Sequence, residues 1–257
     1  MSLFPAQGNA AKIIRGCVML LDGRDTATMT RTGTRVDEWR DQLGSGNKVL
    51  TGFAGTGYNP ITVSGLFGSQ GGVRFSSTFL ETAAAFTTMN WSTGWTVLIA
   101  GQKTDQTAQY IVSDSTYTVF GTGPNSRLGS GTISNTAYGL PVSTSCVFGA
   151  RYTGSALRYI LDGQLYVTIN GTASPGSGAF GKLQIGGLLP GNFGNMDVGM
   201  MAIYNVSLTP QEIDMMTRWM YANMKFAAPV APTWNIVCDG NSLCAGRNSA
   251  GTSYTMS

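Results

Sequence analysis

The chain has 257 residues, of which 35 are glycine and only 11% are charged, and its formal net charge is +3. A chain of this length with so much glycine and so little charge favours short strands joined by tight turns, and it predicts an all-β fold. The 16 lysines and arginines are scattered apart from a loose group at Arg24, Arg31, Arg35 and Arg40, so no dense basic face for nucleic acid is indicated.

The N-terminal stretch carries no export or membrane signal. Met1–Pro5 lacks a basic start, and polar residues follow it instead of an apolar segment. The longest early apolar run, Cys17–Leu21, is too short to span a membrane. We therefore predict a soluble protein with no signal peptide, no membrane insertion and no nucleic-acid partner.

The four cysteines are Cys17, Cys146, Cys238 and Cys244, and they could pair in three ways. Without an export signal, reduced and buried thiols are expected. Cys17 and Cys146 each fall in an apolar strand pattern, which indicates packing. No cysteine or histidine spacing suggests a zinc site.

Apolar and alternating runs predict a series of short strands separated by turn residues. Strands at this density are typical of a sandwich or jelly roll. The expected strands are Lys12–Leu21, Val36–Gln42, Gly72–Leu80, Trp95–Gly101, Tyr110–Val112, Tyr117–Phe120, Cys146–Tyr152, Lys182–Gly186 and Val198–Tyr204. The rest of the segment from Thr104 to Pro141 is too rich in glycine, serine and threonine to assign.

A β-hairpin is predicted over Ala156–Ile169. Asp162 and Gly163 lie at its centre, and these residue types accept the two positive φ angles of a type I′ turn. The flanking runs are therefore expected to pair in antiparallel register.

One helix is predicted near the end of this domain. Thr209-Pro-Gln-Glu212 is a capping box with proline at the first helical position. One face of the helix then carries Ile213, Met216, Met220 and Met224 and should be buried on the sandwich. An extended linker with two prolines follows at residues 226–233, so the first domain is predicted to span residues 1–225.

Several segments of this domain, in their order along the chain, resemble laminin G-like, concanavalin A-like lectin domains. These segments are Val36–Asn47, Gly72–Phe75, Leu161–Gly163 and Gly199–Ile213, and the resemblance covers residues 12 to 225. It implies a two-sheet jelly roll with one closing helix, a fold commonly recruited for glycan or surface binding. In phage and bacterial surface proteins such a domain often precedes a catalytic module.

Residues 234–257 contain the one stretch typical of covalent chemistry. An apolar strand from Trp234 to Cys238 leads into Gly240-Asn-Ser-Leu243, which resembles the first block of SGNH (GDSL-type) hydrolases, with Asn241 in place of the usual aspartate. The resemblance implies Ser242 as nucleophile, with Gly240 and Asn241 in the same block, and a helix beginning at Ala245. The alternative interpretation is a polar turn after a strand.

A serine nucleophile needs a base, and this family takes it from a distant Asp-x-x-His block. The chain contains no histidine. We therefore predict that it does not hydrolyse esters by itself, and that Ser242 acts only if the chain is the front part of a longer esterase.

Exposed aromatic side chains would stack on sugar rings, and the candidates in loop-like stretches are Tyr58, Trp91, Tyr117 and Tyr138. Packing in the core or rim is the alternative for each. No cofactor is expected, although some related domains hold a calcium ion. The oxygen donors to inspect for calcium are Asp22, Asp25, Asp41 and Asp197, which can equally serve as structural turn residues.

The sequence leaves two hypotheses for function. The first is a non-catalytic binding module on a phage virion, as a tail or capsid-surface protein made in the host cytoplasm, that contacts surface glycan or neighbouring subunits within an oligomeric assembly. The second is the N-terminal part of an SGNH-type esterase that deacylates surface carbohydrate.

Overall fold

The structure is a computed structural model. It describes residues 15–44, 49–52, 59–90, 93–105, 109–114, 118–122, 126–128, 131–133, 141–169, 180–188, 192–226, 235–239, 243–247 and 253–255. The chain divides into two compact units, Met1–Phe226 and Ala227–Ser257. No helix among the described residues is long and apolar enough to cross a membrane.

Strands dominate the first unit. Its strands are β1 (Cys17–Asp22), β2 (Met29–Thr32), β3 (Arg35–Arg40), β4 (Val49–Gly52), β5 (Ile61–Phe67), β6 (Gln70–Phe75), β7 (Leu80–Thr82), β8 (Trp95–Lys103), β9 (Gln109–Ser113), β10 (Thr118–Thr122), β11 (Ser126–Leu128), β12 (Gly131–Ile133), β13 (Cys146–Tyr152), β14 (Leu157–Leu161), β15 (Gln164–Ile169), β16 (Gln184–Ile185), β17 (Gly187–Leu188), β18 (Asn192–Phe193) and β19 (Met196–Tyr204). Two helical elements accompany them, the 3-10 helix η1 (Thr26–Thr28) and the helix α2 (Pro210–Met224).

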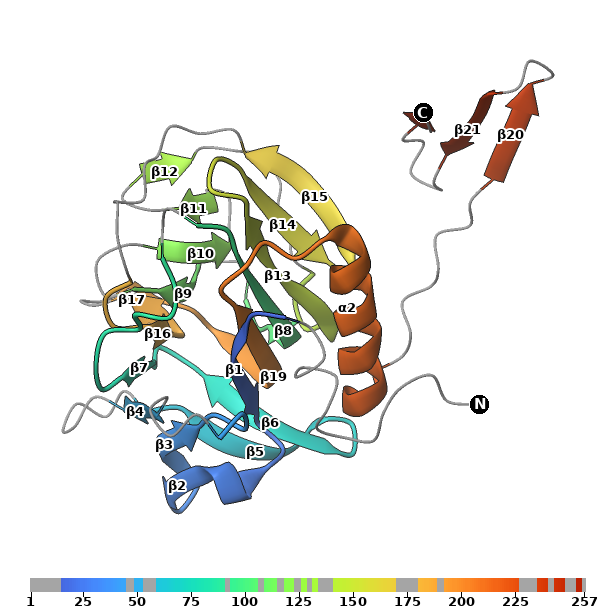
Figure 1. Ribbon diagram of the computed structural model, residues 1–257. Helices are drawn as coiled ribbons and strands as arrows, with labels where there is room; N and C mark the ends of the chain where they lie inside the picture. Colours follow the sequence, from blue (N-terminus) through green and yellow to red (C-terminus); the bar gives the residue numbers. More distant parts are fainter. Residues whose placement is uncertain are drawn as a thin grey trace. The chain divides into compact units, whose positions relative to one another are not determined.

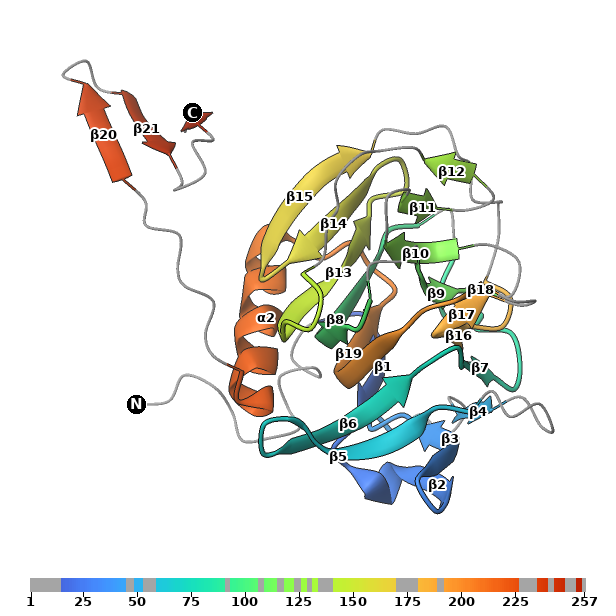
Figure 2. The same cartoon turned by 180° about the vertical axis from the view of Figure 1, so that it is seen from behind.

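Fifteen of these strands form two layers (Figures 1 and 2), and β11–β12 and β17–β18 form two separate strand pairs. One layer has the order β1-β19-β8-β13-β14-β15, and the other has the order β6-β5-β3-β4-β7-β16-β9-β10 with β2 beside β3. The layers are continuous through β19, because Met196–Val198 pairs with β6 and the rest of the strand pairs with β1. The paired strands are antiparallel, and the predicted all-β two-sheet sandwich is confirmed.

Two cores hold the first unit together, and β8 contributes to both. Trp95, Val97 and Ile99 lie in the core between the layers, whereas Leu98 and Ala100 lie in a second core under α2. This alternation is the period-two pattern of a strand that is buried on both faces.

The helix α2 covers the outer face of the first layer and contacts β8, β13, β15 and β19. Thr209 accepts a hydrogen bond from the Glu212 amide, and the Glu212 carboxylate accepts one from the Thr209 amide, which completes the predicted capping box. All four predicted inward residues are buried: Ile213, Met216, Met220 and Met224. Both the helix and its buried face are therefore confirmed.

The predicted hairpin is formed by β14 and β15. Asp162 and Gly163 have φ angles of 50° and 83°, as the type I′ turn requires. Asp162 Oδ1 also accepts hydrogen bonds from the Val147 amide at 3.0 Å and from the Tyr221 hydroxyl at 2.5 Å. These bonds fasten the turn to a neighbouring strand and to α2.

Several predicted strands have different limits. The first strand begins at Cys17, after a turn at Gly16, whose φ is 78°. The run Gly72–Leu80 is not one strand, because the chain bends after Phe75 at Ser77, whose φ is 53°, and β7 then starts in another part of the layer. The strands β2 and β5 have no alternating apolar pattern and were not expected.

The second unit holds a small antiparallel sheet of β20 (Asn235–Asp239), β21 (Leu243–Arg247) and β22 (Ser253–Thr255). The predicted strand before the SGNH-like block is present. The predicted helix from Ala245 is wrong, because Leu243–Arg247 pairs with β20 as the second strand of a hairpin. Antiparallel pairing satisfies the backbone groups of β20 that face β21 within this short segment, which a lone strand followed by a helix could not do.

Candidate functional site

All the residues predicted from sequence as catalytic or ligand-binding lie outside the described residues. They are Gly240, Asn241 and Ser242 of the SGNH-like block and the aromatic residues Tyr58, Trp91, Tyr117 and Tyr138. The hairpin of β20 and β21, which flanks the SGNH-like block, replaces the strand-to-helix turn on which the esterase hypothesis relied.

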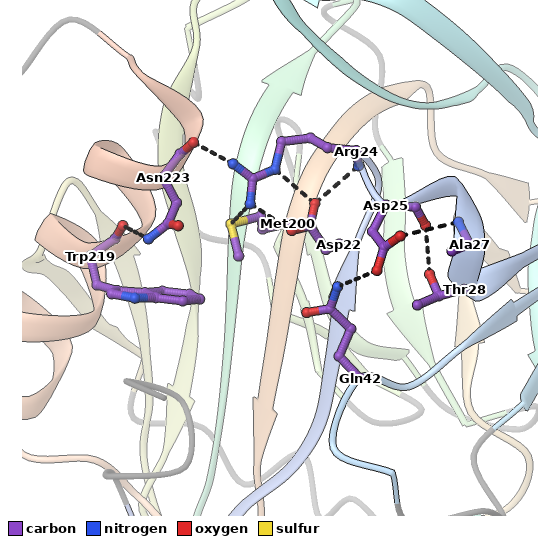
Figure 3. Close-up of polar contacts among 9 residues, drawn as sticks. All are labelled: Asp22, Arg24, Asp25, Ala27, Thr28, Gln42, Met200, Trp219 and Asn223. Carbon is purple, nitrogen blue, oxygen red and sulfur yellow. Dashed lines mark hydrogen bonds and ion pairs between the residues drawn. The ribbon is translucent and has the colours of Figure 1, made fainter. Parts of the chain in front are cut away.

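The structure has a cavity of about 310 Å³ in the first unit, where β1 ends beside the last turns of α2. Its volume is near the lower limit of small-molecule sites, which begin at roughly 300 Å³. The residues lining it are Asp22, Arg24, Asp25, Gln42, Met200, Trp219 and Asn223. Figure 3 shows these side chains, with those of β1 and the following loop on one side and those of α2 on the other.

Arg24 joins the end of β1 to α2 across this cavity. Its Nε and Nη2 atoms donate to the two carboxylate oxygens of Asp22 at 2.8 and 2.5 Å, and its Nη1 donates to the backbone carbonyl of Asn223 (Figure 3). The last carbonyls of a helix have no partner within the helix, and a cation there also interacts favourably with the helix dipole. Arg24 thus stabilises the C-terminal end of α2 from a distant part of the chain.

The position of Asp22 follows from strand pairing. Asp22 lies opposite Met200, and the Gly23 amide donates to the Gly199 carbonyl at 2.7 Å, so the chain leaves β1 next to β19. The Asp22 side chain is 9% exposed and that of Arg24 is 17% exposed. This ion pair is therefore nearly buried, and its two members satisfy each other.

Asp25 and Gln42 form the outer wall of the cavity. One carboxylate oxygen of Asp25 accepts from the Ala27 amide at 3.1 Å, which caps η1, and the other accepts from Gln42 Nε2 at 3.1 Å (Figure 3). The Gln42 amide donates to the Leu20 carbonyl, while Asp41 accepts from the Leu20 and Leu43 amides. The loop from residue 41 to 43 is thus held along β1, and both polar side chains are pre-positioned.

The α2 wall combines an aromatic ring with an amide. Trp219 and Met200 are almost fully buried and belong to the core under the helix. Asn223 lies one turn after Trp219 and donates to the Trp219 carbonyl at 2.8 Å. The cavity therefore has an apolar side made by indole and thioether groups, and a polar side made by amide, carboxylate and guanidinium groups.

This arrangement can bind a small polar ligand, because its side chains offer both donors and acceptors for hydroxyl groups. The carboxylates of Asp22 and Asp25 and the guanidinium of Arg24 give the lining of the cavity a formal net charge of one negative unit. Among the described residues, no serine, cysteine or lysine lines the cavity, and the sequence has no histidine to act as a base. The lining residues therefore hold no nucleophile and base pair of the kind that a triad uses.

The four aspartates considered for calcium fall in two places. Asp22 and Asp25 line the cavity and Asp41 lies on the adjacent loop, whereas Asp197 is fully buried elsewhere, against Arg74 at 2.8 Å and Gln102 at 2.8 Å. Within the described part of the chain, no three acidic, cysteine or histidine side chains gather as a metal site would require. The expectation that the chain holds no cofactor, with a structural calcium ion as the alternative, stays a prediction.

The local sequence held one sign of this site. Asp22-Gly-Arg-Asp25 places three charged residues directly after an apolar strand, as ligand-binding loops often do. The contributions of Trp219 and Asn223 could not be anticipated, since they come from a helix almost 200 residues later and read locally as a packed face.

Neither a protein-family model nor a curated protein sequence matches the chain. Among solved structures, it is similar to Trypanosoma rangeli sialidase, with 12% identity and a TM-score of 0.53 over 83% of this chain and 34% of the sialidase chain. It is also similar to the binding domain of Paraclostridial Mosquitocidal Protein 1, with 12% identity and a TM-score of 0.54 over 90% of this chain and 55% of that chain. The chain thus spans about a third of the sialidase chain and about half of the toxin chain. These similarities reflect a shared β-sandwich fold.

Proposed function

We propose that the chain is a non-catalytic glycan-binding module and that the cavity between β1 and α2 binds a sugar unit. The observation that carries this proposal is the lining of that cavity, where Asp25, Gln42 and Asn223 stand beside the ring of Trp219. Sugars present hydroxyl groups at their edges and C–H groups on their faces. Planar amide and carboxylate groups suit the edges, while the indole of Trp219, only 3% exposed, forms an apolar border of the cavity and not a stacking surface.

The fold comparisons support this proposal at a coarse level. One neighbour is a sialidase that was also solved in complex with sialic acid, and the other is the binding domain of a toxin. A sandwich of this type can host many activities, so the fold is only a prior and the argument depends on the cavity.

Glycan binding is tested with the whole chain on an oligosaccharide panel, followed by titration calorimetry with the best ligand. Gln42→Ala removes one hydrogen-bonding wall of the cavity but leaves the backbone amide that bonds to Leu20. We expect it to weaken binding by about tenfold, which corresponds to one or two hydrogen bonds.

The matched control is Gln164→Ala, since Gln164 is an exposed glutamine on β15 and does not line the cavity. It should bind as the unchanged chain does. The proposed site is wrong if Gln42→Ala keeps full affinity. The proposed function is wrong if the folded chain retains no glycan at millimolar ligand concentrations.

The setting expected from the sequence, an oligomeric assembly on a phage virion, is a separate proposal that rests on the laminin G-like pattern of the sequence. Mass spectrometry of purified particles tests it directly. Recovery of the chain only from the soluble lysate would count against it.

A further inference from the structure

Two arginines face each other across neighbouring strands with no counter-charge between them. Arg151 on β13 is paired in register with Arg158 on β14. On the outer sides of this pair, Arg151 is paired with Thr96 of β8 and Arg158 with Thr168 of β15, so the neighbouring positions across the sheet are uncharged. Like charges directly opposite each other in an antiparallel pair destabilise a sheet, which makes the arrangement costly for folding alone.

Neither guanidinium has a carboxylate within ion-pair distance among the described residues. Arg151 is half-buried, and its Nε donates to Ser207 Oγ at 2.6 Å, which holds the side chain in place before α2 begins. Arg158 is exposed. Burial, and then the charge of Arg158, lower the pKa of Arg151. One fixed and one free guanidinium therefore share a small area of surface.

One acidic group acts on this pair: the charge of Glu212 raises the pKa of Arg151, against the larger effects of burial and of Arg158, and its carboxylate is also bonded to other groups. The Glu212 carboxylate accepts from the Thr209 amide at 2.7 Å and from the Thr209 hydroxyl at 2.9 Å, and it lies 3.7 Å from Arg15. Arg15 is itself exposed, so a third guanidinium adds positive charge on this side of α2. The capping box occupies the amides of Thr209 and Glu212, and the site rests on the arginines and not on the helix end.

We propose that Arg151 and Arg158 together bind the oxyanion group of an acidic sugar, a carboxylate or a sulfate ester. A guanidinium offers a planar fork of donors that matches such groups, and an anion between two of them removes their mutual repulsion. The sugar part of this inference rests on the proposed glycan-binding function. The site differs from the β1 cavity, whose own charge is negative and which suits neutral hydroxyl groups.

The test titrates the full chain with a glucuronate-containing oligosaccharide, a sulfated oligosaccharide, a neutral oligosaccharide of the same length, and sodium sulfate. We expect both acidic oligosaccharides to bind more tightly than the neutral one, and their affinity to fall as sodium chloride is raised. Arg158→Gln should weaken acidic binding by about tenfold or more, and Arg158→Lys should recover only part of it.

Arg31→Gln is the control, since Arg31 is also exposed on a strand and, within the described part of the chain, makes only a hydrogen bond of 3.4 Å to Thr62. Without ligand, Arg158→Gln should keep or raise the melting temperature, because it removes a like-charge contact. A fall in melting temperature with unchanged ligand affinity would identify Arg158 as structural and overturn the proposal.

The outcomes separate this inference from the glycan-binding proposal. If the neutral oligosaccharide binds as well as the acidic ones and only Gln42→Ala weakens it, the arginine site is wrong and the cavity proposal stands. If only sodium sulfate responds to Arg158→Gln, the pair is a small-anion site and the assignment to an acidic sugar is overturned.

Discussion

Replacing Arg24 by methionine is expected to destabilise the protein by about 3 kcal/mol, because the change leaves nearly buried groups without partners. Methionine keeps the apolar stem but removes both side-chain hydrogen bonds to Asp22 and the bond to the Asn223 carbonyl. The Asp22 carboxylate, 9% exposed, would then keep only the Arg24 backbone amide as a donor among these contacts.

The magnitude follows from burial. Breaking a buried ion pair by removing one partner costs about 3–5 kcal/mol, whereas an exposed pair contributes about 0–1 kcal/mol. The pair of Arg24 and Asp22 is close to the buried limit, but its residual exposure places the expected cost at the lower end. For a domain of this size a cost of about 3 kcal/mol lowers the melting temperature by about 6–12 °C.

The chain offers a matched control in Arg35 and Asp37, another arginine and aspartate two residues apart, with a distance of 2.7 Å. There the arginine side chain is 53% exposed and the aspartate 24%, so Arg35→Met should cost less than about 1 kcal/mol. Urea unfolding of both variants gives the two free energies of unfolding, provided that the dependence on urea is unchanged. Equal costs for the two variants would refute the conclusion that burial makes the first pair stabilising.

Three further outcomes follow from local geometry. Gly149→Ala should prevent folding or lower the free energy of unfolding by more than about 4 kcal/mol, because the added Cβ would lie 1.9 Å from the Val97 carbonyl oxygen. A soluble variant with an unchanged melting temperature would contradict this. Thr209→Ala should cost about 1 kcal/mol through loss of the cap that bonds to the Glu212 amide, measured by thermal unfolding against the unchanged chain. Burial raises the pKa of the Cys146 thiol from 9.0 to about 12, so its contribution to stability is present below pH 9 and is lost as the pH rises towards 12. Alkylation of the native protein at pH 8 should leave Cys146 unmodified in peptide mapping, and rapid labelling would disprove the burial.

The elements predicted correctly are those whose chemistry is local. The β14–β15 turn follows from Asp162 and Gly163, which accept positive φ, and α2 follows from the capping box and the spacing of its buried methionines. The order of the strands could not be predicted from the sequence, because it depends on pairings between distant segments. Met196 on β19, for example, pairs with Phe75 on β6 and with Lys103 on β8, and no local pattern specifies those partners.

The candidate site was predictable only in part. Asp22 and Asp25 are among the oxygen donors to inspect for calcium, because some related domains hold that ion, and both line the cavity, although each is engaged with protein groups. Aromatic residues were sought in loops, yet the ring at this site belongs to Trp219 on the buried face of α2. A stripe of apolar residues on a helix predicts which face is buried. It does not reveal that the ring of Trp219 on that face also borders the cavity.

The cavity depends on an irregularity in β19 at Gly199. Before it, Met196 and Val198 point into the core between the layers; after it, Met201 and Ile203 do so, because the register shifts between Val198 and Met200. Successive side chains of a strand point to opposite faces, so without this shift Met200 would share the face of Met196 and Val198. Its side chain would then point into the core between the layers and away from the cavity.

Gly199 also lies close to the last turn of α2. A Cβ at Gly199 would lie 2.1 Å from the terminal methyl of Met224, the flexible end of that side chain, so a larger residue here would require the Met224 side chain to move. The same turn presents the Asn223 carbonyl to Arg24, and the Gly199 carbonyl accepts from the Gly23 amide. The register shift of β19, the last turn of α2 and the exit of β1 thus meet at one place in the fold, and the contacts of Arg24 with Asp22 and Asn223 in the candidate site lie beside it.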